Sequence, residues 1–349
     1  MEKELLKCQG ISKCYGEHWA LKDCSFSLQR GSFNVIVGPS GCGKTTLLEI
    51  ISGLQKETKG EIWLDDSKQT EIIRRKIAVV FQEPALFPYM SVEENILFGA
   101  PEDADFDIHN KAGEIAELLG LSERRCQRSD TLSGGEKQRT AIGRALMKGT
   151  DLILMDEPFS ALDAPLKQRL GDKLRSLQQQ LSLTILYVTH DQNEAMRLAD
   201  HLIVMKDGEI QQQGDPRSIY EHPLNTFVAG FIGNPAMNLL KAKVKGQKIY
   251  FHQEMLPFPY EQTFDQEQEV IIGIRPSQIE YGSGEMSGVC KEIKYYGDQI
   301  QALIEWDGYL LQVLLPAAEV LPSCAGIMFD LRRCVFFDAE NGGRIDLYS

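Results

Sequence analysis

Short apolar runs alternate with polar loops and helical periodicity through the middle of the chain. Four of these runs, rich in Val, Ile and Leu, begin at residues 33, 77, 151 and 184 and read FNVIVG, IAVVFQ, DLILMDE and TILYVTH. Strands that are apolar at nearly every position are typical of a parallel sheet covered on both faces, with helices as crossovers. We therefore expect an α/β domain with a mostly parallel sheet.

Two segments carry the spacing of an amphipathic helix. In residues 162–181 leucines recur at intervals of three and four, and Pro165 suits a first turn. Residues 105–119 place their aliphatic side chains on one side and are followed by Gly120. We expect helices in both segments, the second within a helical subdomain of about residues 85–150.

The pattern changes near the motif GNPAMN, residues 233–238. Short β-rich runs separated by Gly, Pro and Asp follow it, among them EVIIGIR, IQALIEW, YLLQVLL and CVFFD. Such runs are typical of a small all-β barrel or sandwich. The predicted domains are therefore residues 1–236 and residues 237–349.

Charge and composition exclude several classes of partner. The formal net charge of −13 argues against nucleic acid or anionic lipid held by electrostatics, because both need concentrated Lys and Arg. The longest aliphatic runs are strand-sized and the first residues show no secretion signal, so we expect a soluble, non-secreted chain. Eight scattered cysteines without a C-x-x-C pair favour reduced thiols.

The clearest chemical motif is GPSGCGKTT at residues 38–46, which follows the first apolar run. It matches G-x-x-x-x-G-K-[ST], a loop whose backbone N–H groups hold phosphates. Lys44 would neutralise charge on the β- and γ-phosphates, and the Thr45 hydroxyl would ligate Mg²⁺. The residues expected to contact the nucleotide are Gly38, Pro39, Ser40, Gly41, Cys42, Gly43, Lys44, Thr45 and Thr46.

Two predicted strand ends supply acids and a histidine. Asp156 and Glu157 follow an apolar strand at the edge where parallel sheets bind ligands. Asp156 can hold the Mg²⁺ shell and Glu157 can polarise a water for attack on the γ-phosphate, whereas capping of the next helix is the plainer interpretation. We expect His190, at the end of a strand parallel to the one before Glu157, to contact the γ-phosphate, although a lone histidine is more often structural.

A second glycine-rich stretch, LSGGEKQR at residues 132–139, precedes a helical pattern. Ser133, Gly134 and Gly135 would form a helix start suited to an anion, or Ser133 would simply cap the helix. Because the first loop already surrounds its own phosphates, we expect this stretch to serve another nucleotide.

The motifs GPSGCGKTT, FQEPALFPYMSVEENI, LSGGEKQR, LILMDEPFSALD and VTHDQ, in that order, closely resemble the ATP-binding-cassette (ABC) ATPases. The resemblance implies a P-loop NTPase cassette that hydrolyses ATP with Mg²⁺. It also implies a dimer of two copies, in which each ATP lies between the P-loop of one chain and the signature of the other. Glu136 then stands where the signature more commonly has Gln.

Further roles follow from this resemblance, residue by residue. Tyr15 resembles the aromatic residue that stacks on adenine, Gln82 the residue that contacts Mg²⁺ and water, and Asp163 the residue that communicates across the dimer. The apolar segment after Gln82 resembles the surface that holds the coupling helix of a membrane permease subunit, or else forms a buried internal loop. The expected location is peripheral, on the cytoplasmic face of the cell membrane, and an extracytoplasmic solute-binding protein would be engaged only indirectly.

The second domain resembles the transport-associated OB-fold (TOBE) domain of maltose-type sugar-import ATPases. GNPAMN favours carbohydrate or glycerol-phosphate import, whereas SALDAPLK is closer to iron and polyamine members, and sulfate importers share the layout. Two further hypotheses are a non-transport cassette protein acting on ribosomes or DNA, and a regulatory protein whose β domain binds an oxyanion or a transcription factor. Residues 64–80 lack the glycine and paired prolines usual in the family, so we expect a local difference there.

Overall fold

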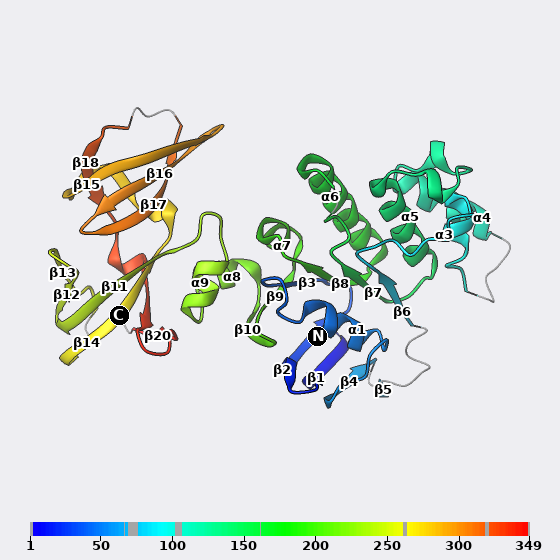
Figure 1. The fold of residues 1–349 in the computed structure, drawn as a ribbon, viewed down its shortest axis with the longest axis horizontal. Helices are drawn as coiled ribbons and strands as arrows, with labels where there is room; N and C mark the ends of the chain where they lie inside the picture. Colours follow the sequence, from blue (N-terminus) through cyan, green and yellow to red (C-terminus); the bar gives the residue numbers. More distant parts are fainter. Residues whose placement is uncertain are drawn as a thin grey trace. The chain divides into compact units, whose positions relative to one another are not determined.

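The computed structural model describes residues 3–65, 67–68, 76–101, 107–160, 162–260, 264–317 and 321–347 (Figure 1). The chain forms two compact units, Met1–Pro216 and Arg217–Ser349.

A six-stranded sheet forms the centre of the first unit, in the order β10-β9-β3-β8-β7-β6. Its strands are β3 (Phe33–Val37), β6 (Ile77–Val80), β7 (Leu152–Asp156), β8 (Thr184–Thr189), β9 (His201–Lys206) and β10 (Glu209–Gly214). All neighbours are parallel except β10, which is antiparallel to β9. The four apolar runs are β3, β6, β7 and β8, and nearly all their side chains are buried, so the predicted parallel sheet is confirmed.

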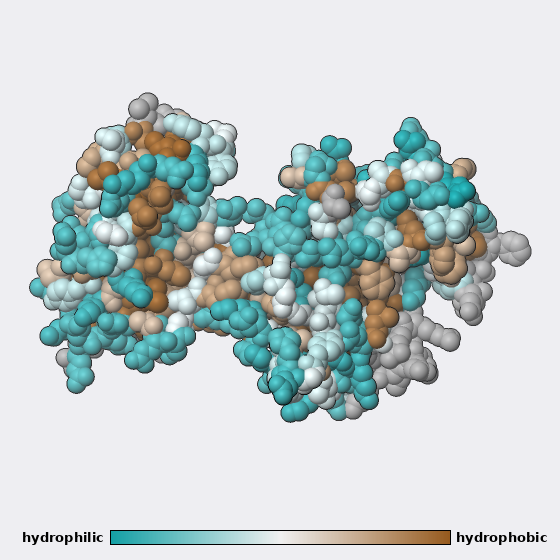
Figure 2. All heavy atoms as spheres, in the orientation of Figure 1, coloured by the Kyte–Doolittle hydropathy of each residue, from teal (hydrophilic) through white to brown (hydrophobic). Residues whose placement is uncertain are grey.

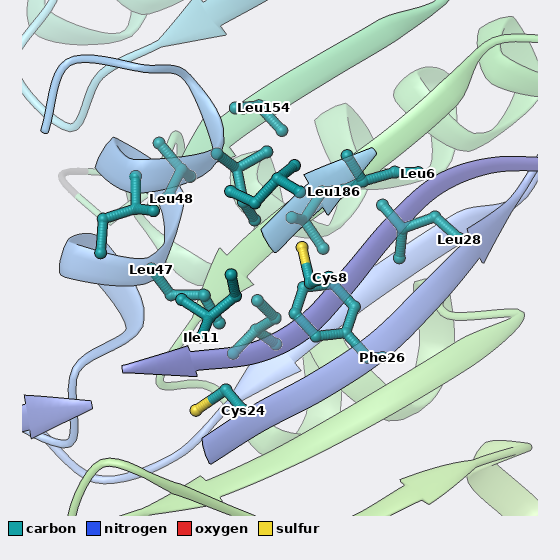
Figure 3. Close-up of a cluster of buried hydrophobic side chains, with 14 of the residues drawn as sticks. Leu6, Cys8, Ile11, Cys24, Phe26, Leu28, Leu47, Leu48, Leu154 and Leu186 are labelled. Atoms are coloured by element: carbon teal, nitrogen blue, oxygen red, sulfur yellow. The ribbon is translucent and has the colours of Figure 1, made fainter. Parts of the chain in front are cut away.

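A four-stranded antiparallel sheet, in the order β2-β1-β4-β5, shares a hydrophobic core with the central sheet. Its strands are β1 (Glu4–Tyr15), β2 (His18–Gln29), β4 (Lys59–Leu64) and β5 (Ser67–Lys68). In Figure 3 side chains from this sheet, from α1 (Lys44–Ile51) and from the central strands point toward one another, among them Leu6, Leu47 and Leu154. The core therefore ties the helix after the P-loop to both sheets.

The first unit also contains five helices that follow α1 among the described residues. They are α3 (Val92–Leu97), α4 (Ile108–Leu118), α5 (Gly134–Met147), α6 (Ala164–Leu181) and α7 (Gln192–Leu198), with 3₁₀ turns at Ser122–Arg124 and Ser129–Thr131. Helices α3, α4 and α5 pack together within the predicted helical subdomain, and α6 covers the predicted helix of residues 162–181. Residues 105 and 106 of the other predicted helix lie outside the described residues, as do residues 66 and 69–75 of the segment where a local difference was expected.

The second unit holds two antiparallel sheets, in the orders β13-β12-β11-β14-β19-β20 and β17-β16-β15-β18. The elements are α8 (Pro216–Glu221), α9 (Thr226–Phe231), β11 (Asn238–Gly246), β12 (Lys248–Tyr250), β13 (Met255–Pro257), β14 (Phe264–Ile274), β15 (Glu280–Tyr296), β16 (Gln299–Trp306), β17 (Tyr309–Pro316), β18 (Cys324–Met328), β19 (Val335–Asp338) and β20 (Arg344–Ile345). Short 3₁₀ turns lie at Pro276–Gln278 and Leu331–Arg333. One apolar core, which includes the buried Trp306, joins the two sheets.

Arg275 connects the two short helices to the β-rich part of the second unit. It is 3% exposed, and its guanidinium lies 3.9 Å from the centre of the Tyr220 ring. It donates to the backbone carbonyls of Tyr220, Ala229 and Ile232, which lie in or directly after α8 and α9. Burial lowers the pKa of Arg275 to about 10. These bonds explain why α8 and α9 group with the β-rich unit, whereas the predicted boundary at residues 233–238 would separate them from it.

Candidate nucleotide site

The loop from Gly38 to Gly43 joins the buried strand β3 to α1. A Cβ atom on Gly38 would lie 2.3 Å from the Met205 carbonyl oxygen, and one on Gly43 would lie 2.6 Å from that of Ala20. Gly43 also has a φ of +99°, a conformation that favours glycine, and it caps α1 without a side-chain hydrogen bond. No cap side chain therefore competes for the N–H groups at the start of α1, which suit an anion.

Lys44 lies buried beneath this loop, with 6% of the residue exposed. Its Nζ donates to the carbonyl oxygens of Gly38 at 2.8 Å and of Pro39 at 2.9 Å. Pro39, Ser40, Gly41, Thr45 and, in part, Thr46 are accessible, whereas Cys42 is buried. The loop therefore presents an open side with an ammonium group held directly behind it.

Asp156, the last residue of β7, lies beside Thr45. It is 5% exposed, and burial raises its pKa although a hydrogen bond from Thr45 opposes the shift. Its Oδ1 atom is buried and has no hydrogen-bond partner within the described ranges. Hard oxygen ligands of this kind fit Mg²⁺, which proteins usually hold through one or two carboxylates together with phosphates and water. The described residues contain no group of three or more His, Cys, Asp and Glu that could hold a metal ion by themselves.

Glu157 and His190 meet at the ends of neighbouring parallel strands. Asp156 pairs with Val188 across β7 and β8, and the Glu157 N–H donates to the Val188 carbonyl oxygen at 3.0 Å. The Glu157 Oε2 atom lies 2.9 Å from His190 Nδ1. Glu157 has a φ of +42°, which is uncommon for a residue other than glycine and concentrates at functional sites.

A buried network holds the residues on both sides of His190. Glu194 is 4% exposed and accepts from the Tyr187 hydroxyl at 2.6 Å and the Thr189 hydroxyl at 2.7 Å. Lys167, near the start of α6, lies 3.3 Å from Glu194 and 3.1 Å from Asp191. Burial opposes the charge on Lys167, but the two carboxylates outweigh it and raise its pKa. The sequence does not predict this network, although Asp191 before a helical segment is an N-cap signal.

The second glycine-rich stretch forms a capping box at the start of α5. Glu136 Oε2 accepts from the Ser133 N–H at 2.9 Å and the Ser133 hydroxyl at 2.7 Å, and the Ser133 oxygen accepts from the Glu136 N–H. Arg124 donates to Glu136 Oε1 at 3.2 Å. The bonds from Ser133 and the charge of Arg124 lower the pKa of Glu136. A Cβ atom on Gly135 would lie 2.9 Å from Leu162, whereas Gly134 faces open space.

The remaining predicted site residues, Tyr15, Gln82 and Asp163, are exposed. The Tyr15 hydroxyl bonds to Gln55, and Lys13 Nζ lies 5.0 Å from the centre of the Tyr15 ring. Asp163 precedes α6 without a side-chain cap bond. Within the part of the chain that the structure describes, no hydrogen bond or ion pair joins Tyr15, Gln82 or Asp163 to the P-loop.

Comparison with known proteins identifies the chain's relatives. The family described as ABC transporter matches residues 21–160, and the MalK OB fold domain matches residues 233–279. The ABC transporter ATP-binding protein YcjV of Escherichia coli O6:K15:H31 is 37% identical, over 96% of this chain and 98% of its own length. The chain belongs to the ABC transporter family. Another relative of this ABC protein, the trehalose/maltose import ATP-binding protein MalK of Thermococcus litoralis, is 42% identical over 77% of each chain.

Other members of the ABC family widen the comparison. The Fe(3+) ions import ATP-binding protein FbpC of Photorhabdus laumondii is 35% identical over 92% of this chain and 93% of its own length. A dimeric ATP-binding cassette, MJ0796, solved in a post-hydrolysis state with ADP and Pi, is 33% identical with a TM-score of 0.56, over 61% of this chain and 99% of its own. These matches confirm the predicted cassette with an OB-fold domain, an ATP-binding subunit of an importer, and ATP hydrolysis as its activity.

Proposed function

We propose that this ABC ATPase works as a dimer of two copies that closes around two ATP molecules and drives solute import. In this proposal the solute is a carbohydrate or a glycerol-phosphate, with iron, sulfate or polyamine import as the alternative. The OB-fold match to MalK and the sugar-import names of two relatives, MalK and the xylose/arabinose protein XacJ of Haloferax volcanii, support the carbohydrate branch. FbpC supports iron import.

One observation carries the catalytic part of the proposal: Glu157 Oε2 lies 2.9 Å from His190 Nδ1, next to Asp156 at the edge of the sheet that bears the P-loop. The Glu157 carboxylate would accept a proton from the attacking water, while His190 orients that carboxylate and contacts the γ-phosphate. The buried bonds of Thr189 and Asp191 would keep His190 at this position.

Nucleotide and metal binding follow from the P-loop and its neighbours. Lys44 would leave its carbonyl partners to pair with the β- and γ-phosphates, because a charged acceptor forms the stronger hydrogen bond. Thr45 and the unpartnered oxygen of Asp156 would hold Mg²⁺, with Gln82 reaching it from the end of β6. When bound, the ion neutralises charge on the phosphate oxygens.

Separation of the two glycine-rich helix starts supports the sharing of ATP across a dimer. In Figure 1 helices α1 and α5 lie apart, with β6 and β7 drawn between them. Among the described residues, Ser133 and Glu136 bond only to each other, to Arg124 and within their own helix. MJ0796 was solved as a dimer. Ser133–Glu136 would therefore contact the ATP on the partner's P-loop, with Tyr15 stacked on adenine in its own chain and Asp163 at the dimer interface.

An exposed aromatic group after Gln82 supports a membrane partner. Phe87, Tyr89 and Phe98 are 38%, 82% and 59% exposed, and the Phe87 and Phe98 rings lie 4.4 Å apart between centres. The buried Asn95 holds the backbone of this segment through bonds to Phe87 and Met90. The face drawn in Figure 2 is mainly hydrophilic, with scattered apolar areas.

The aromatic group would receive the coupling helix of a permease subunit on the cytoplasmic face of the membrane. An extracytoplasmic solute-binding protein would act only through that permease. Among the described residues, no helix is long and apolar enough to cross a membrane.

The Glu157→Gln variant tests the catalytic proposal. An amide keeps the shape of the side chain but accepts a proton far less readily, so the variant should bind ATP, hardly hydrolyse it, and accumulate as an ATP-loaded dimer. Gel filtration with ATP should show the larger species, and Glu117→Gln, at an exposed position of α4, should behave like the unmodified chain. Full activity of Glu157→Gln would remove this residue from the mechanism, and a variant that stays monomeric with ATP would argue against the sandwich.

A further inference from the structure

A cavity of about 690 Å³ lies at the edge of the central sheet opposite the P-loop. The hairpin of β1 and β2 forms one side, and the starts of β3 and β9 form the other. Its size falls within the range of small-molecule sites. Since β3 runs from this cavity to the P-loop, the two places are the opposite ends of one strand.

Three residues that line this cavity, each from a different strand, carry a buried polar atom without a hydrogen-bond partner in the described parts of the chain. These atoms are Gln29 Oε1, Asn34 Oδ1 and His201 Nδ1. Asn34 is 1% exposed, and its Nδ2 donates to Ser32 and to the Ile185 carbonyl oxygen at 3.1 Å, which fixes Oδ1 as the atom left over. Buried polar atoms are rarely left unpaired, because the lost hydration is not replaced.

The chemistry of these three atoms indicates which ligand groups could form hydrogen bonds with them. Two are amide oxygens, which need donors, and burial lowers the pKa of His201, which favours a neutral imidazole. The Asp200 carboxylate at the same edge is already engaged by Arg175 and by the Phe33 N–H at 2.8 Å.

The remaining charges in the lining balance. Glu4 and Lys7 contribute one charge of each sign, and most of the other polar side chains are serines and glutamines. No excess charge therefore selects an ion, whereas hydroxyl groups can donate to the amides and both donate to and accept from the imidazole.

We propose that this cavity binds a small, uncharged polyhydroxylated molecule through Gln29, Asn34 and His201. Phe26, which also lines the cavity, offers an apolar contact for the carbon side of such a molecule. This site is separate from the nucleotide site, so the proposal does not rest on the catalytic roles given above.

Saturation-transfer NMR on the full chain tests the proposal, with glycerol, D-xylose and D-glucose as probes and citrate as a charged comparator. At least one of the three polyols should receive saturation, more strongly than citrate. Gln29→Leu and His201→Phe each remove one partner, so each should raise the dissociation constant of that polyol about tenfold. Gln253→Leu, at an exposed amide in the second unit, is the matched control and should leave binding unchanged.

Three outcomes would overturn the proposal. The first is no transfer to any of the polyols, which would mean that water alone fills the cavity. The others are equal polyol binding by both variants and the unmodified chain, and stronger saturation transfer to citrate than to the polyols. ATP binding checks that the variants are folded. If either fails to fold, the ring resonances of His201 in the unmodified chain decide the matter. They must shift when the polyol is added, and an unchanged resonance would count against the site.

Discussion

The two glycine-rich helix starts of this protein, at α1 and at α5, look alike in sequence and differ in how their backbone is satisfied. At α1 the cap is Gly43, without a side-chain bond, and Gly38 and Gly43 press against backbone that leaves no room for a Cβ atom. At α5 the cap is Ser133, and the carboxylate of Glu136 already occupies its N–H and hydroxyl groups.

The difference teaches that a glycine-rich motif can be built for two kinds of contact. The P-loop is shaped to enclose phosphates, with its cation held in place behind it. At the start of α5 in the single chain, the Glu136 carboxylate accepts hydrogen bonds from Ser133 and also binds Arg124. A nucleotide that contacts the start of α5 would have to rearrange the capping box of Ser133 and Glu136. Such a rearrangement is consistent with a site that forms only when a second copy of the chain binds.

The largest effect is expected at the P-loop. Lys44→Ala leaves charge on the β- and γ-phosphates uncompensated, so the rate of ATP hydrolysis should fall about a hundredfold or more. A phosphate-release assay measures the rate, and Lys22→Ala, at an exposed position of β2, is the control. Hydrolysis at the unmodified rate by Lys44→Ala would show that the P-loop assignment is wrong.

Mixed dimers test whether α5 serves its own chain or the partner. Lys44→Ala spoils a P-loop, and Ser133→Arg blocks a helix start by its bulk and by displacing the cap. With one change on each chain, sharing across the dimer puts both defects into one site and leaves the other able to occlude ATP. With both changes on one chain, each shared site carries a defect. Counting occluded nucleotide in the two dimers separates the arrangements, and retention only in the second would refute sharing.

A smaller effect is expected from Glu136→Gln. The amide can still cap the helix but removes a negative charge from the place where a partner's γ-phosphate would lie. The ATP concentration needed for half-maximal dimer formation should therefore fall about fivefold, as light scattering can measure. Glu123→Gln changes an exposed acid next to Arg124 and serves as the control. Weaker dimer formation by Glu136→Gln would mean that the carboxylate itself supports the contact.

The smallest effect concerns stability at the P-loop end. Burial raises the pKa of Asp156, so its charged form weakens the folded state at neutral pH. This cost declines as the pH falls through the raised pKa and is gone below the ordinary pKa of the carboxyl group. Asp156→Asn should thus raise the free energy of unfolding of the nucleotide-free protein by less than about 1 kcal/mol at neutral pH, with no gain in acid.

The same variant should lose the extra stability that Mg²⁺ and ATP give the unmodified chain. Denaturant titration measures both quantities, and Asp298→Asn, at an exposed position, should change neither. Full stabilisation of Asp156→Asn by Mg²⁺ and ATP would exclude Asp156 as a metal ligand.

The sequence was sufficient for the parallel strands, because β3, β6, β7 and β8 are buried on both faces and therefore apolar throughout. The antiparallel sheet of β1 and β2 was missed, since its strands face the core on one side and carry charged residues such as Lys7 and Lys22 on the other. Bulges between β1 and β2 also interrupt the regular alternation that marks a half-buried strand.

At the candidate site, residue types were predictable and most contacts were not. The close approach of Glu157 and His190 depends on β7 and β8 being neighbours in the sheet. A hydrophobic pattern does not predict the order of strands in a sheet. The capping box of Ser133 and Glu136 could have been predicted, because the pattern S-x-x-E before a helix is its sequence signature. The role of Lys167 could not be predicted, since its ion pairs with Asp191 and Glu194 join segments that are distant in the sequence.

Arg275 has a consequence for how such proteins can be reshuffled by recombination. Its guanidinium binds carbonyl groups in or directly after α8 and α9. These helices and the β-rich sheets therefore form one structural unit, beginning near Arg217, that recombination should transfer as a whole. A crossover inside GNPAMN would pair the helices of one parent with the β-rich sheets of another, and a parent without an arginine at position 275 would leave buried carbonyl groups without their donor. A crossover before α8 keeps all of these partners together, and chimeric genes that survive selection should therefore be joined there.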